Sequence, residues 1–145
     1  GRQSLQGNLI LKILEVSSAK HSELVDITAE LVALIPSGMS SGICHVYSSH
    51  TTAALTINEN ADPDVKHDIL CALEKAFPWN NSTYNHVEGN SAAHVKASLT
   101  GFSVTVPFIN SKLWLGTWQS VYLCEFDGPR RRRLAVQFIE DKTGK

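Results

Sequence analysis

Four short apolar segments in the last third of the sequence constrain the fold more than any other feature. Apolar residues, many of them β-branched or aromatic, dominate these segments, which are FSVTVPF (102–108), KLWLG (112–116), SVYLCEF (120–126) and RLAVQFIE (133–140). Turn residues separate them at INSK, near GTWQ and at DGPR. Short apolar runs between such turns are typical of strands joined by hairpins. The end of the chain is therefore predicted to form an antiparallel sheet.

The first hundred residues mix extended segments with helices. Residues 8–16, 43–47 and 54–57 have the pattern of strands. Ile27, Leu31, Leu34 and Ile35 recur at helical spacing after a cap at Asp26 or Thr28, and Pro36 and Gly38 end that helix. Strands dominate and the helices are inserted early, so the predicted class is α+β with a largely antiparallel sheet or sandwich.

Two further helices are expected between residues 62 and 101. Asp62-Pro63-Asp64 is a favourable helix start, with an acidic cap and a proline whose missing N–H does no harm. An apolar stripe follows, and Pro78 ends the helix. A shorter helix over residues 91–99 is predicted to be capped by Ser91 and ended by Gly101.

Length, charge and cysteine usage narrow the class of protein. At 145 residues and 43% hydrophobic side chains, residues 1–145 are expected to form one domain. A net charge of -1 argues against nucleic-acid binding, and no apolar run approaches the roughly 20 residues that span a membrane. Three widely spaced cysteines in apolar segments indicate reduced core thiols and a cytoplasmic protein without a disulfide.

Two histidine-containing segments are candidates for a metal site. His50 lies in SSHTTAAL, an apparently extended stretch, and His86 and His94 lie in NHVEGNSAAH. A bend at Gly89 would allow the latter two to meet, and three imidazoles with an open fourth position can bind a zinc-type ion. The alternative is that these histidines are solvated, since no local zinc signature is present. His21 and His67 are expected at the surface.

Two polar groups complete the candidate site. Glu59 and Asn60 lie in the turn before the second helix, whose N-terminus can bind an anion, although turn formation alone also explains them. Arg130 begins a run of four arginines and is a candidate phosphate ligand. The alternative is a solvated rim, and since side chains alternate along a strand, at most two arginines can face one site.

Four ordered motifs, HTTAALTINENADPDV, HVEGNSAAHVKASLTG, LGTWQ and CEFDGPRRRR, resemble the YjbQ (UPF0047) family, also called secondary thiamine-phosphate synthases. The resemblance covers about residues 42–137. It implies an α+β fold, a homotrimer, a metal ion held by residues matching His50, His86 and His94, and a weak thiamine-phosphate synthase activity. The chain departs from the family pattern at Ser111, where glycine is usual, and at the bulky Phe108.

The leading hypothesis is an enzyme that uses a divalent ion to organise a small phosphorylated substrate. Three imidazoles favour zinc over magnesium, with Mg²⁺ as an alternative for activity. Asn90 would orient a ligand, Glu59 and Asn60 would act as base and polar rim, and Arg130 would neutralise phosphate. A trimer that binds a metal or small ligand without catalysis, and a metal-dependent hydrolase, are the alternatives, so whether the protein is an enzyme stays open.

Overall fold

A computed structural model describes residues 9–142 of the chain. Its strands are β1 (Leu9–Ser17), β2 (Glu23–Asp26), β3 (Ser41–Ser48), β4 (Ala53–Glu59), β5 (Ser103–Ile109), β6 (Lys112–Leu113), β7 (Gln119–Glu125) and β8 (Arg131–Glu140). Its helices are α1 (Thr28–Leu34), α2 (Pro63–Ala76) and α3 (Ser91–Thr100). None of these helices is both long and apolar enough to cross a membrane.

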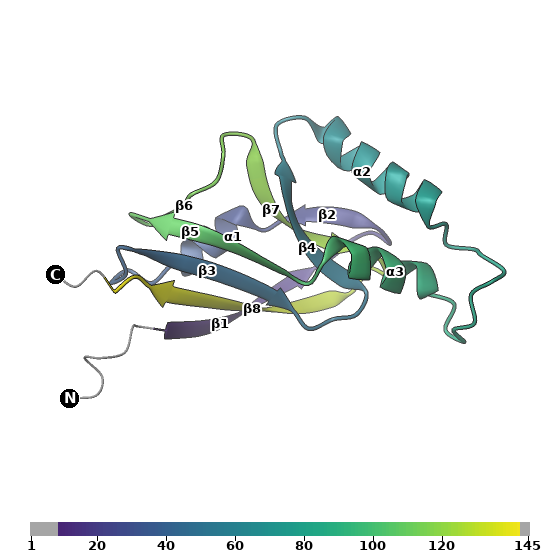
Figure 1. The fold of residues 1–145 in the computed structure, drawn as a ribbon, viewed down its shortest axis with the longest axis horizontal. Coiled ribbons are helices and arrows are strands. Elements are labelled where there is room, and N and C mark those ends of the chain that lie inside the picture. Colours follow the sequence, from purple (N-terminus) through teal and green to yellow (C-terminus); the bar gives the residue numbers. More distant parts are fainter. Residues whose placement is uncertain (1–8, 143–145) are drawn as a thin grey trace.

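The strands form two antiparallel sheets. The larger has the order β1-β8-β3-β5-β6 and the smaller the order β2-β7-β4. β8 is hydrogen-bonded to both β1 and β3, so the last strand of the chain lies beside the first. Figure 1 shows α2 and α3 next to the smaller sheet. The predicted α+β class with a largely antiparallel sheet is confirmed.

Two apolar clusters divide the molecule into layers. The first lies between the two sheets and includes Val46, Leu55, Phe138 and, from α1, Leu31. The second lies on the other face of the smaller sheet, where Ala54 and Tyr122 meet Ala93 and Ala97 of α3. α2 contributes only partly buried residues to this second cluster, and none of its side chains is fully buried. The smaller sheet is therefore the middle layer.

The local predictions agree with the structure best where caps and turns are strong. Asp62 caps α2 by accepting a hydrogen bond from the Asp64 amide at 2.9 Å, and Gly101 ends α3 with a φ of 104°. The N-cap position of α1 is Ile27, although Asp26 Oδ1 accepts a hydrogen bond from the Thr28 amide at 2.9 Å as a cap would. The cap predicted at Ser91 is wrong, since the N-cap of α3 is Asn90. Strand β2 was not predicted, and KLWLG yields only the two-residue β6. Asn8, the predicted start of the first strand, lies outside the described residues.

The hairpin between β5 and β6 explains why glycine is the usual residue where this chain has Ser111. Asn110 and Ser111 both have positive φ, 50° and 65°, as the two central residues of a type I′ turn require. Glycine is favoured at the second of these positions because a side chain there is strained. Phe108, the other departure, is buried and packs edge-to-face on Phe138 with ring centroids 5.8 Å apart.

Ser111→Gly is therefore expected to stabilise the protein. Removal of the strain of a left-handed serine should raise the free energy of unfolding by about 1 kcal/mol. Urea unfolding of the variant and of Ser103→Gly, a matched control in a strand of the same sheet, measures this. A lower unfolding midpoint for Ser111→Gly than for the parent chain would contradict the turn assignment.

A buried ion pair connects β7 to β8 where the two sheets meet. Arg132 Nε donates to Glu125 Oε1 at 2.8 Å, and Arg132 Nη2 donates to Glu125 Oε2 and, at 2.9 Å, to Thr52 Oγ1. Glu125 is 0% exposed and Arg132 4%. Burial acts to raise the pKa of Glu125, but hydrogen bonds from Arg132, the Asp127 amide and Ser18 outweigh it and hold that pKa below its ordinary value.

Loss of Arg132 is expected to be strongly destabilising because it leaves Glu125 buried without a counter-charge. Arg132→Met should lower the free energy of unfolding by about 3–5 kcal/mol. Arg133→Met, which removes only an exposed pair with Glu15 at 4.0 Å, should cost less than about 1 kcal/mol. Denaturant titration of both variants at pH 7 checks this, and equal losses would contradict a special role for Arg132.

The same pair predicts an acid dependence of stability. Because the folded-state pKa of Glu125 is lowered, its contribution is fully present above the unfolded-state value of about 4.3 and is lost as the pH falls through the lower folded-state value. Glu125→Gln should therefore be less stable than the parent at pH 7, and its stability should fall less between pH 5 and pH 3.

Candidate functional site

Three segments distant in the sequence form one polar cleft of about 440 Å³. They are the β3–β4 loop, the chain that leads into α3, and the β7–β8 turn with the start of β8. Figure 1 places them at the end of the molecule opposite β6. The lining residues are mostly polar or charged: Ser49, His50, Thr51, Thr52, His86, Glu88, Asn90, His94, Asp127, Arg130 and Arg132.

His86 and His94 come together through a bend at Gly89. Gly89 has a φ of 75° and its amide donates to the His86 carbonyl at 3.1 Å, which reverses the chain before α3. The two imidazole rings then lie with centroids 5.3 Å apart and at 86° to each other. Glu88 Oε1 is 3.6 Å from His86 Nε2. This segment therefore presents two adjacent imidazoles and a carboxylate to the cleft.

His50 lines the same cleft. The sequence predicted that it lies in a strand, but in the structure it lies in the β3–β4 loop. Because residues 49–52 are not extended, Ser49, His50, Thr51 and Thr52 all line the cleft, and the predicted alternation of their side chains is wrong. Burial and the charge of Arg132 lower the pKa of His50, so its imidazole is neutral at pH 7.

The main chain of Arg133 holds the His50 ring through Nε2. The Arg133 amide lies 2.9 Å and the Arg133 carbonyl 3.2 Å from this nitrogen. A backbone amide can only donate, so Nε2 accepts this bond and the proton of the neutral ring lies on Nδ1. Nδ1 could bind an ion if Nε2 instead donated to the Arg133 carbonyl, an arrangement that is usual for a metal-binding histidine. Across residues 9–142, however, no three His, Cys, Asp or Glu side chains are arranged closely enough to hold an ion together.

Asn90 contributes a buried acceptor that has no partner. Its Nδ2 donates to Asp127 Oδ2 at 2.9 Å, which fixes the orientation of the amide. Its Oδ1 is buried and makes no hydrogen bond in the described chain. An unpaired buried carbonyl oxygen costs about 1–3 kcal/mol and is explained most simply by a ligand that donates to it or by a cation.

Asp127 is a site residue that the sequence did not indicate. Its carboxylate accepts hydrogen bonds from Asn90 and, at 3.1 Å, from Arg130 Nη2, and it lies 4.0 Å from His21 Nε2. In the sequence it was recognised only as part of the turn DGPR. That turn packs tightly, because a Cβ on Gly128 would lie 2.3 Å from the Lys20 carbonyl oxygen. Asp127 is therefore held in a fixed position between Asn90 and Arg130.

The arginine run alternates as a strand requires. Arg130 and Arg132 line the cleft, whereas Arg131 and Arg133 are exposed. The alternative interpretation of the arginine run, a solvated rim, therefore applies only to Arg131 and Arg133. Arg132 is committed to Glu125, so Arg130, whose side chain is 52% exposed, is the guanidinium of this run that can contact a ligand.

The structure does not bring Glu59 and Asn60 to the cleft. His50 precedes β4 and Glu59 ends it, and seven residues of strand separate these ends by about 20 Å. Tyr122 Oη donates to the Glu59 carbonyl at 3.0 Å and lies 2.9 Å from Asn60 Oδ1, so this turn is held against β7. The N-terminus of α2 lies at that far end too, and the helix that begins at the cleft is α3.

Sequence comparison places the chain among proteins of one family. A family model described as UPF0047 protein YjbQ-like matches residues 12–141. The UPF0047 protein YugU of Bacillus subtilis is 47% identical over 131 residues, covering 90% of this chain and 99% of YugU. The UPF0047 protein MJ1081 of Methanocaldococcus jannaschii is 48% identical over 140 residues, covering 92% and 99%.

Solved structures agree with this placement. An uncharacterised conserved protein of the YjbQ/UPF0047 family from Clostridium acetobutylicum has a TM-score of 0.84 and 49% identity, covering 88% of this chain and 99% of its own. A YbjQ-like protein of unknown function from Sulfolobus solfataricus has a TM-score of 0.86 and 32% identity, with coverages of 93% and 99%. By sequence and by fold, the chain belongs to the YjbQ-like UPF0047 family.

Proposed function

We propose that the cleft binds a divalent transition-metal ion together with a small phosphorylated molecule. The observation that carries the proposal is that His50, His86, His94, Asn90 and Arg130 line one cleft, although they come from three separate segments. Neutral imidazoles are ligands for zinc-type ions, and an arginine is suited to phosphate oxygens. Metal and phosphate ligands side by side are typical of sites that act on phosphorylated compounds.

His86, His94 and His50 would hold the ion. The first two rings are already adjacent. His50 would complete the set through Nδ1 after an adjustment of the loop in which Nε2 exchanges the Arg133 amide for the Arg133 carbonyl. The unpaired Asn90 Oδ1 supports a cation or a cation-bound water nearby. The donor set favours zinc, with Mg²⁺ as an alternative for activity. When bound, the ion would polarise a phosphate oxygen.

The reaction proposed for this cleft is a thiamine-phosphate synthase type of condensation, after the resemblance noted in the sequence. It joins a phosphorylated thiazole to a pyrophosphorylated pyrimidine, with loss of pyrophosphate. Arg130 would neutralise the departing pyrophosphate, and Asp127 would hold the guanidinium in place at 3.1 Å. Asn90 would orient the substrate. Glu59 and Asn60 have no part here because they lie at the far end of β4.

Replacement of any one of the three histidines is expected to abolish stable metal retention. Loss of an outer-sphere partner of a metal ligand weakens metal binding by roughly 10–100-fold. Loss of a ligand itself should weaken zinc binding by more, and this is expected of His50→Ala, His86→Ala and His94→Ala. His45 lies on β3 and is hydrogen-bonded to Thr105 of β5, so His45→Ala should leave zinc binding unchanged. Elemental analysis of protein purified without chelator, followed by zinc titration, measures both. Equal zinc content in the parent and in His94→Ala would contradict the shared site.

Turnover separates the proposed reaction from its alternatives. Pyrophosphate release from the pyrimidine diphosphate and thiazole phosphate pair would support condensation, and Arg130→Ala should then raise KM more than the control Arg131→Ala. Phosphate release from generic phosphoesters would indicate a metal-dependent hydrolase. Saturable binding of the phosphorylated compounds without turnover would indicate a binding protein.

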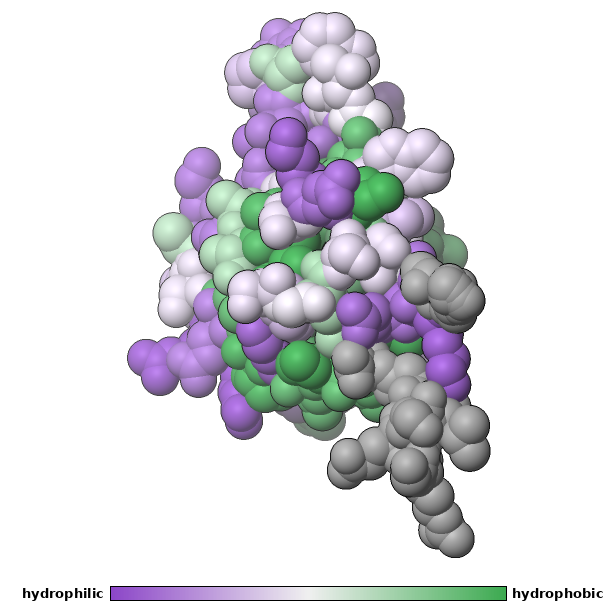
Figure 2. All heavy atoms as spheres, turned by 90° about the vertical axis from the view of Figure 1, so that its left-hand side faces the viewer, coloured by the Kyte–Doolittle hydropathy of each residue, from purple (hydrophilic) through white to green (hydrophobic). Residues whose placement is uncertain are grey.

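We also propose that the protein is a homotrimer that covers the outer face of the larger sheet. β1 exposes Leu9, Leu11 and Ile13, with fractional exposures of 59%, 59% and 49%. The register places Ile139 and Ile43 beside Leu9, and Tyr47 in the row of Ile13. Figure 2 shows apolar side chains grouped on the lower part of one end of the molecule. Such a two-sided apolar sheet favours burial by another copy of the chain.

A charge in the apolar row of the edge strand β1 should prevent assembly. Leu11→Lys is expected to yield monomers, whereas the parent chain should sediment at three times the monomer mass at micromolar concentration. Val87→Lys is a matched control, because Val87 is 99% exposed in a loop. A parent chain that sediments as a monomer would contradict the trimer.

A further inference from the structure

A second reactive cluster lies on α2, away from the histidine cleft. Cys71 is exposed, although the sequence had indicated a core thiol, and its Sγ lies 3.5 Å from His67 Nε2, one helical turn earlier. His67 Nδ1 lies 3.1 Å from Asp68 Oδ1. The three side chains form an acid–imidazole–thiol series, which is the order in which a histidine activates a cysteine.

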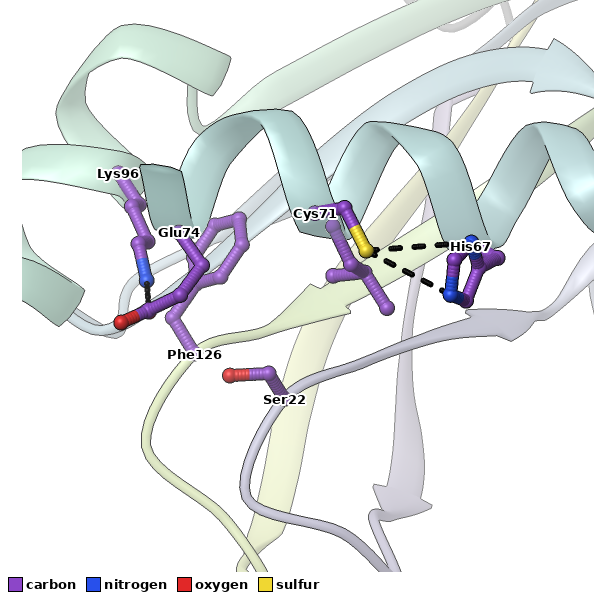
Figure 3. A pocket seen from close by; sticks show the side chains of 7 residues that line it. Ser22, His67, Cys71, Glu74, Lys96 and Phe126 are labelled. Carbon is purple, nitrogen blue, oxygen red and sulfur yellow. Dashed lines mark hydrogen bonds and ion pairs between the residues drawn. The ribbon is translucent and has the colours of Figure 1, made fainter. Parts of the chain in front are cut away.

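The cysteine borders a cavity of about 240 Å³ beneath α2. Figure 3 shows Cys71 and His67 on the helix and Ser22 across from the helix, with Phe126, Glu74 and Lys96 toward the other end of the view. Leu70 and Phe126 make part of the wall apolar. The space beside the thiol therefore suits a small group of a few non-hydrogen atoms.

The other two thiols cannot react in the same way. Cys44 and Cys124 are buried, and burial raises the pKa of each to about 12. A thiol with so high a pKa is almost never ionised near neutral pH, and the thiolate is the nucleophile. Cys71 is therefore the one cysteine of the chain that combines access, a neighbouring base and adjoining space.

The hydrogen bonds around His67 assign the protons. A carboxylate only accepts, so the contact with Asp68 is satisfied when His67 Nδ1 carries the ring proton. Cys71 Sγ lies 3.5 Å from Nε2 and 3.8 Å from Nδ1, so the thiol is beside the ring, and Nε2 is the nitrogen that can accept its proton. Asp68 also stabilises the imidazolium that results. His67 is therefore a positioning and proton-accepting residue for Cys71, which carries out the covalent step.

We propose that Cys71 is a site of thiol–disulfide exchange with small disulfides, and that the cavity under α2 houses the group that becomes attached. Cys71 Sγ gives its proton to His67 Nε2 and attacks one sulfur of the small disulfide. The disulfide S–S bond breaks, a new bond forms to Sγ, and the second sulfur leaves as a thiolate that takes up a proton. Cys71 is oxidised and the departing half of the small disulfide is reduced, so no further redox partner is needed.

The charges around the thiol favour a cationic disulfide. The cavity and dyad include two carboxylates, of Asp68 and Glu74, and one amine, of Lys96. Lys96 Nζ lies 2.6 Å from Glu74 Oε1, so its charge is already compensated and Asp68 remains without a cationic partner other than His67. An amine-bearing disulfide such as cystamine is therefore expected to react faster than dithiodiglycolate, its carboxylate-bearing counterpart.

The experiment incubates the reduced full-length chain with cystamine at pH 7 and follows the mass of the intact protein. One cysteamine per chain should attach, at Cys71 by peptide mapping, and dithiothreitol should remove it. Cys71→Ser should show no attachment. Attachment at Cys44 or Cys124 in the folded protein, or none at Cys71, would overturn the proposal.

His67→Gln separates activation from simple exposure. At pH 7 the exchange rate of this variant should fall about tenfold, because the thiol has lost the neighbouring base that takes up its proton. At pH 9.5, where a free thiol ionises without help, its rate should match that of the parent. The titratable or charged groups that the structure places at the dyad and cavity are His67, Asp68, Glu74 and Lys96. Lys75→Met, at an exposed position of α2 outside the cavity lining, serves as a control that should retain the parent pH profile. Equal rates for His67→Gln and the parent at pH 7 would overturn the role of His67.

Discussion

The buried pair between Arg132 and Glu125 is the interaction on which the site depends. It joins the end of β7 in the smaller sheet to the start of β8 in the larger one, and its second guanidinium nitrogen reaches Thr52 in the β3–β4 loop. Glu125 also accepts from the Asp127 amide and from Ser18. Two of the three segments that form the cleft are thus fixed to a single carboxylate. Burial, together with the charge of Arg132, lowers the pKa of His50.

The chemistry of the cleft follows from this scaffold. A buried ion pair adds little net stability compared with an apolar pair, but it holds polar groups in definite positions. Here it positions Asp127, which orients the Asn90 amide and the Arg130 guanidinium together. The remaining imidazoles come from a different kind of element, a glycine bend that leads into α3. Rigid strand ends on one side and a bend on the other leave the cleft open between them.

Much of this architecture could be predicted from the sequence, because strong local signals determined it. The alternating segments predicted most strands, the Asp62-Pro63 start predicted α2, and the four ordered motifs predicted the family. The histidines and Arg130 were identified as candidates although solvated surface positions were the alternative for both, and the structure places them in one cleft. Glu59 and Asn60 were placed in the cleft because they are close to His50 in sequence, but β4 carries the chain to the opposite end of the sheet.

The residues that were missed depend on long-range contacts. Arg132 and Glu125 resemble ordinary surface charges in the sequence, and only the pairing of β7 and β8 with the neighbouring loop shows that they are buried. Asp127 has the appearance of a turn residue. The ion pair and the contacts of Asp127 have no local sequence pattern. Cys71 differs, because it lies off the stripe formed by Val65, Ile69 and Leu73, so its exposure agrees with the helical periodicity.

Because α2 has no fully buried side chain, it is expected to unfold locally before the sheets do. Elements with few buried apolar contacts occupy the low end of the range of local opening free energies, so the amides of α2 should exchange with solvent before those of the sheets. α2 continues directly into the segment that carries His86, ten residues after Ala76. Opening of α2 is therefore expected to loosen the His86 side of the cleft before the side that is hydrogen-bonded to Glu125.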